Sequence, residues 1–281
     1  MVDMDAIVDD LDAERADLDD AVAGLDSRAW RSPTPAEGLT IACQIAHLNW
    51  TDELVLRAIS GAEEFVSGTE GVLVPPSATD AINAGAEFVN AGTEKRSQWP
   101  RDELLAAWRK SAAELSLTLR ALPRGTRIPW FAPRPLSAAA MASSRLMEVW
   151  AHGQDVFDAL SLTREPTRRL IHVARLGVRS RDFAYQLRGM VPPEQEFRVE
   201  LRAPDGEVWC WGPEDAAERV EGSALDFALV ATQRLHRHDS DLVASGEAPE
   251  AWLAIAQAYA GPVGSGRPRL GLGPEGLPGG A

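Results

Sequence analysis

Residues 145–156 read RLMEVWAHGQDV, and this stretch decides how the rest of the chain is interpreted. Glu148 and His152 are four residues apart, so on a helix they project from one face about one turn apart and can bind a single ion. Asp155 lies one further turn along, where it is placed to reach the second imidazole nitrogen of a neighbouring histidine or to hold a water. Arg145 precedes Glu148 by three residues and shares part of that helix face. The stretch predicts a helix with a candidate metal site.

A third ligand is available in QIAHLNW, residues 44–50, where His47 stands four residues after Cys43. His47 would complete a set of two histidines and one carboxylate. Spacing alone leaves another interpretation open. A Glu and a His four apart are common on solvated helix faces, and a His among Ile, Ala and Leu is more often a packed side chain than a ligand. Cys43 is either a fourth ligand or reactive thiol, or a small packing residue.

Apolar periodicity extends the helical interpretation over the first part of the chain. Long helices are predicted within 1–26 and over 40–60, 78–97, 101–122 and 138–160. Thr40 and Ser137 are suited to begin two of these helices. A Pro-rich irregular connection follows Leu122. This part is predicted to be a helical bundle.

The remainder of the chain mixes both kinds of element. A helix is predicted over 167–189, and alternating apolar residues predict strands at 197–202, 208–211 and 217–220. Ala203-Pro204-Asp205-Gly206 predicts the turn of a hairpin. Further helices are predicted at 223–236 and 249–260, followed by a Gly/Pro-rich tail after Gly261 with little structure of its own.

These elements predict an α+β protein with two domains, a helical bundle over 1–163 and a small α+β domain over 164–281. The second domain includes a linking helix and the tail. The domain boundary falls near residue 164 or near residue 190, depending on whether the linking helix belongs to the second domain or to the first.

Charge and composition exclude several classes of protein. The net charge is -14, and residues 1–26 hold ten carboxylates against Arg15 alone, so nucleic-acid binding is disfavoured. No apolar run approaches the roughly 20 residues of a membrane span. Met1 leads directly into acidic residues rather than into a secretory signal, and two cysteines 167 positions apart fit a reducing compartment. We therefore expect a cytoplasmic protein without membrane or nucleic-acid partners.

QIAHLNW and EVWAHGQDV together resemble the metal-binding domain of mycothiol-dependent maleylpyruvate isomerases, which belong to the DinB/YfiT-like superfamily of four-helix bundles. The resemblance covers most of residues 1–160. It implies that His47, Glu148 and His152 hold a divalent metal, usually zinc. It also implies a DinB-like four-helix bundle for the first domain.

The second part resembles a narrower group. The resemblance rests on LRAPDG (201–206), WCWG (209–212), TQRLHRHD (232–239) and AQAYAGP (256–262). These look like an actinobacterial family of maleylpyruvate-isomerase-like proteins without an assigned reaction, whose second domain is similar to a sterol-carrier-like α+β domain. Because the isomerases use an arginine from that domain, the resemblance implies a catalytic role for Arg234 toward the substrate. The alternative is a surface arginine that caps a helix end beside His236.

The resemblance implies a zinc-dependent isomerase or transferase that uses a low-molecular-weight thiol, mycothiol or a similar one, as cosubstrate. Its substrate would be a small electrophile, anionic if Arg145 or Arg234 binds it. Two alternatives stay open: a metal-dependent hydrolase or lyase that activates water, and a non-catalytic ligand-binding protein that retains the metal. The chain is expected to be a monomer or a homodimer.

Overall fold

The computed structural model describes residues 3–61, 63, 65, 78–131, 135–264 and 266–270. The chain divides into two compact units. One comprises Met1–Arg164 with Ala260–Pro262, and the other comprises Glu165–Tyr259 with Val263–Ala281. The sequence placed its boundary between residues 163 and 164. The α+β fold class expected from the sequence, a helical bundle followed by a mixed unit, is confirmed.

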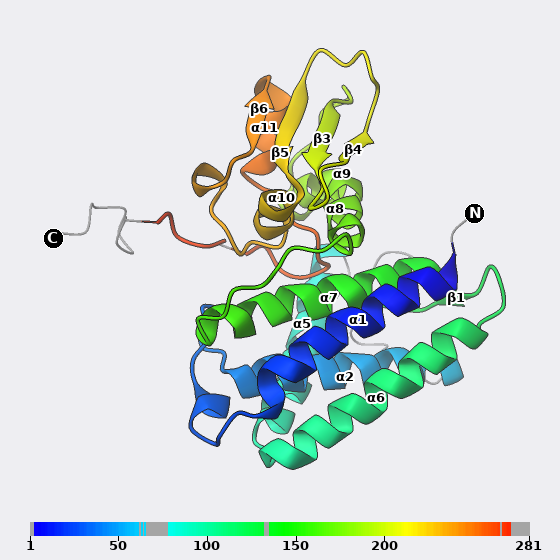
Figure 1. Cartoon of the computed structure of the whole chain (residues 1–281). Helices are drawn as coiled ribbons and strands as arrows, with labels where there is room; N and C mark the ends of the chain where they lie inside the picture. Colours follow the sequence, from blue (N-terminus) through cyan, green and yellow to red (C-terminus); the bar gives the residue numbers. More distant parts are fainter. Residues whose placement is uncertain are drawn as a thin grey trace, which may run out of the picture. The chain divides into compact units, whose positions relative to one another are not determined.

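The first unit is a bundle of long helices (Figure 1). These are α1 (Met4–Ala23), α2 (Ile41–Ser60), α5 (Ala78–Ser97), α6 (Arg101–Ala121) and α7 (Ala138–Ala159). Helix α2 packs against α5, α6 and α7, while α1 packs against α6 and α7. Because α2 is central, most of its residues are buried, including the polar residues Gln44, Asn49 and Asp52.

Capping residues set where the helices begin. The Thr40 hydroxyl accepts a hydrogen bond from the Cys43 N–H, and Ser137 does the same for Ala140 N–H. A short 3-10 helix, η1 (Ala29–Arg31), connects α1 to α2. The Pro-rich connection before α7 contains one small pairing, β1 (Arg127–Ile128) with β2 (Leu136–Ser137). The helices predicted for this half of the chain are all present.

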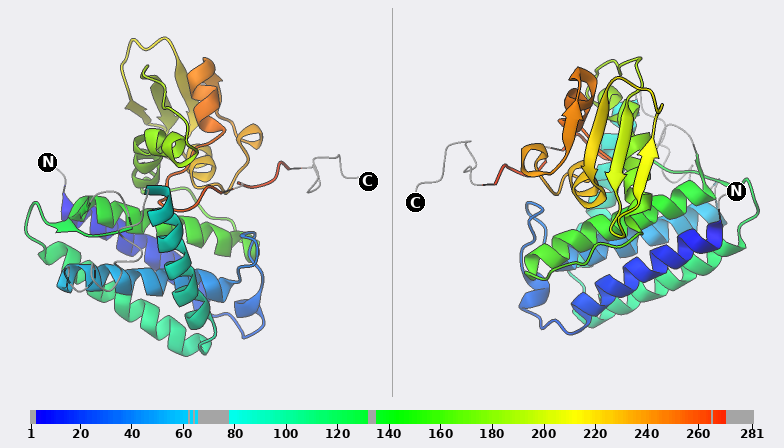
Figure 2. Two further views of the ribbon diagram at one scale, coloured as in Figure 1. Left: turned by 180° about the vertical axis from the view of Figure 1, so that it is seen from behind. Right: turned by 45° about the horizontal axis from the view of Figure 1, so that its top comes forward.

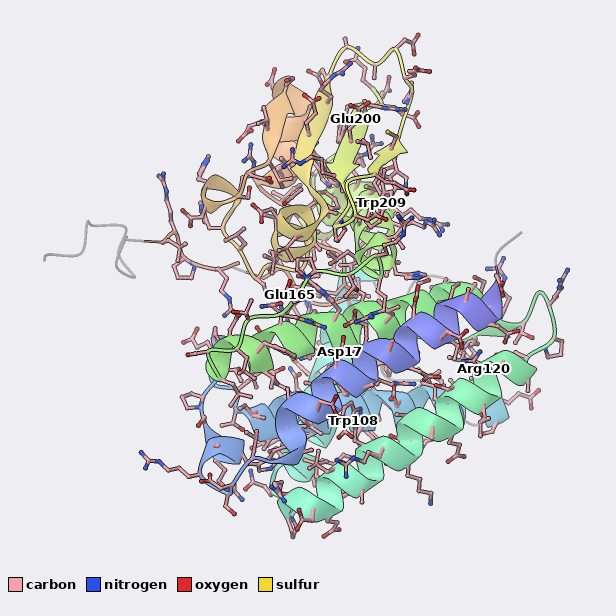
Figure 3. The ribbon with its side chains drawn as sticks, viewed as in Figure 1. Asp17, Trp108, Arg120, Glu165, Glu200 and Trp209 are labelled. Atoms are coloured by element: carbon pink, nitrogen blue, oxygen red, sulfur yellow. The ribbon has the colours of Figure 1, made fainter. Side chains whose placement is uncertain are left out.

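The acidic face of α1 is paired with arginines of α6. Arg120, which is labelled in Figure 3, lies on α6. It bonds the carboxylates of Asp5, Asp9 and Asp12, the Asp9 contact being 2.6 Å. Arg109 binds Asp19 in the same way at the other end of the helix pair. Part of the negative charge of residues 1–26 is thus neutralised by arginines of α6 at the surface of the bundle. No helix of the described residues is long and apolar enough to cross a membrane.

The second unit contains a sheet of strand order β4-β3-β5-β6 (Figure 2, right). Its strands are β3 (Arg198–Arg202), β4 (Val208–Trp211), β5 (Arg219–Ser223) and β6 (Val243–Ser245). Strands β3 and β4 form the predicted hairpin, with Leu201 opposite Trp209. Strand β5 pairs parallel to β3, and β6 pairs antiparallel to β5. In the described residues, four short α-helices and one 3-10 helix accompany the sheet: α8 (Leu170–Arg179), α9 (Arg181–Leu187), α10 (Ala224–Ala231), η2 (Arg237–Asp239) and α11 (Glu247–Leu253).

Several predicted boundaries in this unit are wrong. The single helix expected over 167–189 is two helices, which are separated at Ser180, where the backbone leaves the helical conformation with φ −88° and ψ 7°. The helix expected over 223–236 ends at Ala231, since Gln233 has a φ of 62°. Strand β6 was not predicted, and the last helix is 247–253 rather than 249–260. The described part of the tail, 261–264 and 266–270, forms neither helix nor strand, and 271–281 lies outside the described residues.

Candidate metal centre

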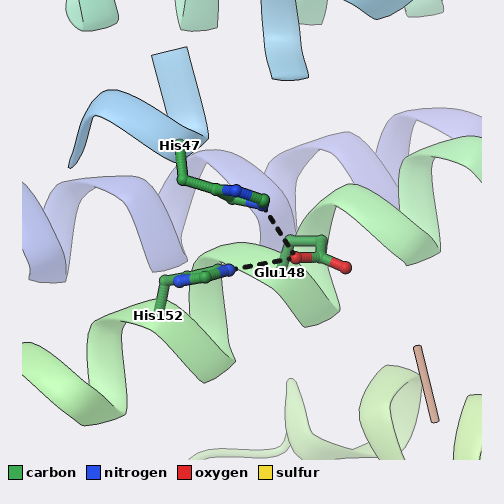
Figure 4. A group of neighbouring side chains, drawn as sticks. All are labelled: His47, Glu148 and His152. Atoms are coloured by element: carbon green, nitrogen blue, oxygen red, sulfur yellow. Dashed lines mark ion pairs between the residues drawn. The ribbon is translucent and has the colours of Figure 1, made fainter. Parts of the chain in front are cut away.

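Helices α2 and α7 bring the three expected ligands together. His47 projects from α2, and Glu148 and His152 project from α7 (Figure 4). Nε2 of His47 lies 3.4 Å from Oε2 of Glu148, and Nε2 of His152 lies 3.2 Å from the same oxygen. One ligand atom from each residue lies within 4.8 Å of the others. Three donors from two packed helices therefore converge on one point.

The cluster is only partly covered. The side chains of His47, Glu148 and His152 are 19%, 20% and 14% exposed. A structural zinc site is closed by four protein ligands, whereas a catalytic one keeps a position for water or substrate. Three ligands at this exposure leave room for a further ligand from solution.

The electrostatics of Glu148 fit a cation. Burial raises the pKa of this carboxyl, but hydrogen bonds with His152 and His47 act against burial, and the pKa lies well below its ordinary 4.5. Among the described residues, the two histidines are the only polar partners recorded for Glu148. No arginine or lysine of the described residues neutralises the carboxylate. Two imidazole nitrogens with one carboxylate oxygen are a donor set that suits zinc and related divalent ions.

Gln44 was missed by sequence reasoning. Its side-chain oxygen contacts Nδ1 of His152, and its amide nitrogen donates to the Thr34 hydroxyl at 2.9 Å. Gln44 is fully buried on α2. The available signal was its position three residues before His47, which places both on one helix face.

The other expected site residues on α7 are placed differently. Arg145 lies in the interior of the bundle, where its Nε donates to Asp52 at 2.9 Å and its side chain is 3% exposed. This position argues against the expected role in substrate binding, because a ligand from solution does not reach the guanidinium. Asp155 is buried one turn beyond His152. Nδ1 of His152 is paired with the side-chain oxygen of Gln44, which can only accept a hydrogen bond.

Two further candidates lie elsewhere. Cys43 is not a member of the cluster, and its sulfur accepts a hydrogen bond from the Thr40 hydroxyl. Arg234 belongs to the second unit, three residues after the end of α10, and its guanidinium donates to the Thr232 carbonyl at 2.6 Å.

The fold and the cluster define a two-unit protein whose helical bundle carries a candidate metal site on its second and last helices. A family model described as the mycothiol maleylpyruvate isomerase N-terminal domain matches residues 11–157, just over half of the 281 residues. The chain belongs to this family. A second model, described as wyosine base formation, matches residues 193–245, the stretch from just before β3 to the end of β6.

Curated proteins and solved structures are also similar to this chain. Uncharacterized proteins from two strains of Mycobacterium tuberculosis are each 47% identical over 268 residues, which is 95% of this chain and 100% of theirs. The crystal structure of the mycothiol-dependent maleylpyruvate isomerase matches with a TM-score of 0.59 at 18% identity, over 89% of this chain and 96% of that one. A histidine-to-alanine variant of that isomerase matches equally well. The chain therefore has the fold of this isomerase.

Proposed function

We propose that this protein is a zinc-dependent isomerase or transferase that uses a mycothiol-type thiol and acts on a small, electrophilic, anionic substrate. The observation that carries the proposal is the convergence of His47, Glu148 and His152 on one partly exposed point. The family membership and the name of the solved relative support the choice of thiol.

Each residue of the cluster has a defined part in this proposal. His47 and His152 present imidazole nitrogens, and Glu148 presents an ionised oxygen between them. Helices α2 and α7 hold the three groups in place before any ligand arrives. A divalent ion bound there supplies Lewis-acid chemistry that keeps a thiol ionised, or water partly ionised, near neutral pH.

The thiol in this proposal comes from a cosubstrate. Cys43 and Cys210 are both free cysteines, and neither belongs to the ligand cluster. Cys43 is already hydrogen-bonded by Thr40, and Cys210 lies on β4 of the second unit. An external thiol also fits the cytoplasmic location expected from the sequence.

Two side chains complete the proposal. Asp155 would support the cluster through a water or an imidazole nitrogen, in which case Asp155→Asn weakens zinc binding about 10- to 100-fold. Arg234 would bind the anionic substrate, in which case Arg234→Ala lowers turnover and leaves zinc affinity unchanged. Unchanged zinc affinity in Asp155→Asn would mean that Asp155 is only a buried helix residue. Unchanged turnover in Arg234→Ala would mean that Arg234 only caps a helix.

The test is calorimetry of the zinc-loaded protein with mycothiol, beside the metal-free protein and His152→Ala. Binding of mycothiol that requires zinc and His152 supports the proposal. A zinc-loaded protein that gives no heat with mycothiol contradicts the thiol part of the proposal and favours a hydrolase or lyase that activates water. A protein that binds no zinc contradicts the proposal as a whole.

A further inference from the structure

A chain of hydrogen bonds runs from the backbone before α2 to the metal cluster. The Thr34 hydroxyl is 3.0 Å from the Leu39 carbonyl oxygen, and the amide nitrogen of Gln44 is 2.9 Å from the Thr34 hydroxyl. The other end of the Gln44 amide contacts Nδ1 of His152. Gln44 is fully buried and Thr34 is 9% exposed, so water does not replace these bonds readily.

The donors in this chain can be assigned from its start. A carbonyl oxygen only accepts, so the single proton of the Thr34 hydroxyl goes to Leu39. The hydroxyl then needs a donor from Gln44, which must be the NH₂ group. The Gln44 oxygen consequently faces His152, and Nδ1 of His152 must carry a proton to meet it.

The first hydrogen bond of this series, between Thr34 and Leu39, is itself held in place. Both the N–H and the hydroxyl of Thr34 bond the Leu39 carbonyl, and Pro33 pairs with Thr40 across the same loop. Thr40 is also the residue that caps α2. The orientation of the Gln44 amide is therefore set by backbone that does not depend on the cluster.

We propose that Gln44 is a positioning residue that holds His152 as the Nδ1–H tautomer. In the neutral imidazole this leaves the Nε2 lone pair facing Glu148, whose Oε2 is 3.2 Å away. The hydrogen bond from Nε2 to Glu148 then forms only when both ring nitrogens carry protons. A lone pair and a carboxylate at that distance repel unless they share a cation, so Gln44 prepares the pair for a metal ion. The metal part of this inference rests on the proposed function.

Without the Gln44 oxygen, a neutral His152 has a better alternative. Its proton moves to Nε2 and forms a hydrogen bond with Glu148. Nε2 of His152 and Oε2 of Glu148, two of the three ligand atoms, are then hydrogen-bonded to each other, and an incoming ion must break that hydrogen bond. Removal of a group that orients a ligand histidine typically weakens metal affinity about 10- to 100-fold.

The experiment compares three variants with the unaltered full-length chain. Gln44→Met keeps the size of the side chain and removes the acceptor, and Gln44→Glu keeps an acceptor for Nδ1. Asn49→Leu is the matched control, because Asn49 is also fully buried on α2 and bonds Ser111 and Glu53 rather than a ligand. Unfolding midpoints are measured for all of them.

Zinc affinity is measured by competition with a chelator, and the tautomer of His152 is measured by ¹⁵N NMR of the metal-free protein at about pH 9.5, where imidazoles are neutral. We expect Gln44→Met to bind zinc about 10- to 100-fold more weakly and to shift His152 toward the Nε2–H form. The zinc affinities of Gln44→Glu and Asn49→Leu should stay within about threefold of the unaltered chain, because the first keeps an acceptor for Nδ1 of His152 and the second changes a residue that contacts no ligand.

Unchanged affinity and tautomer in Gln44→Met would overturn the inference, as would an equal loss of affinity in Asn49→Leu. If the unaltered chain binds no zinc, the proposed function fails, but the NMR result still decides the role of Gln44. The two failures are therefore distinguishable.

Discussion

Arg145 of α7 and Asp52 of α2 form an ion pair inside the helical bundle, with Nε of the guanidinium 2.9 Å from Oδ1 of the carboxylate. Arg15 of α1 binds the other oxygen of Asp52 at 2.8 Å. One buried carboxylate thus joins three helices, two of which carry the metal ligands. Arg145 lies three residues before Glu148, and Asp52 lies five residues after His47.

This relationship predicts a structural effect of Arg145→Met. Arg145→Met removes the donor to Oδ1 of the buried Asp52 carboxylate while Arg15 still pairs with Oδ2, and the loss of one hydrogen bond to a charged group costs about 1.5 to 3 kcal/mol. The free energy of unfolding, measured in urea, should fall by this amount. Arg109→Met is the control, since Arg109 pairs with Asp19 at the surface, where such pairs contribute under about 1 kcal/mol. An unchanged stability together with a raised KM would instead restore the substrate-binding role for Arg145.

Gly92 provides a test of how α5 packs on α2. A Cβ at this position would lie 2.1 Å from Nε1 of Trp50, a buried indole that cannot yield without moving its neighbours. Alanine favours a helix by about 1 kcal/mol over glycine, but overpacking costs about 1 to 3 kcal/mol. Because this overlap is severe, we expect Gly92→Ala to lower the free energy of unfolding. Gly24→Ala meets nothing within 4 Å and should not lower it, so equal effects of the two changes would contradict the packing.

Asp226 gives the second unit a pH dependence. Burial, with repulsion from Asp241, raises the pKa of Asp226 above its ordinary 3.8. A raised carboxyl pKa means that the folded state disfavours the ionised form of Asp226. The ionised carboxylate therefore destabilises the fold at neutral pH, and this effect disappears as the pH falls below the pKa that Asp226 has in the unfolded chain.

Asp226→Asn should therefore increase the free energy of unfolding at pH 7. The amide keeps an oxygen to accept the hydrogen bond that Asp241 N–H now donates to Asp226. The gain should vanish near pH 3.5, below the ordinary value of 3.8. Urea titrations of the two proteins at both pH values measure the difference. A gain of equal size at both pH values would show that charge is not its cause.

Local spacing was sufficient for part of the candidate site. Glu148 and His152 converge because they are four apart on one helix, which is a property of the sequence alone. His47 comes from another helix, and its assignment depended on the resemblance of QIAHLNW to a known family. The structure adds that α2 and α7 pack so that Nε2 of His47 lies 3.4 Å from Oε2 of Glu148.

Other features could not be predicted because they depend on helix packing. The spacing of Arg145 placed it near Glu148 on one helix face. In the structure its side chain instead lies in the core, where it pairs with Asp52 of another helix. Gln44 lies in the same motif as His47, yet its role depends on a loop that ends in Thr40.

The most direct test of the account is the zinc content of the purified protein after dialysis against zinc and removal of unbound metal. The unaltered chain should retain about one equivalent, because three ligands on packed helices are present before binding. A folded triple variant, His47→Ala with Glu148→Gln and His152→Ala, should retain less than about a tenth of an equivalent. Full zinc occupancy in the folded triple variant, or no zinc in the unaltered chain, would contradict the assignment of the metal centre.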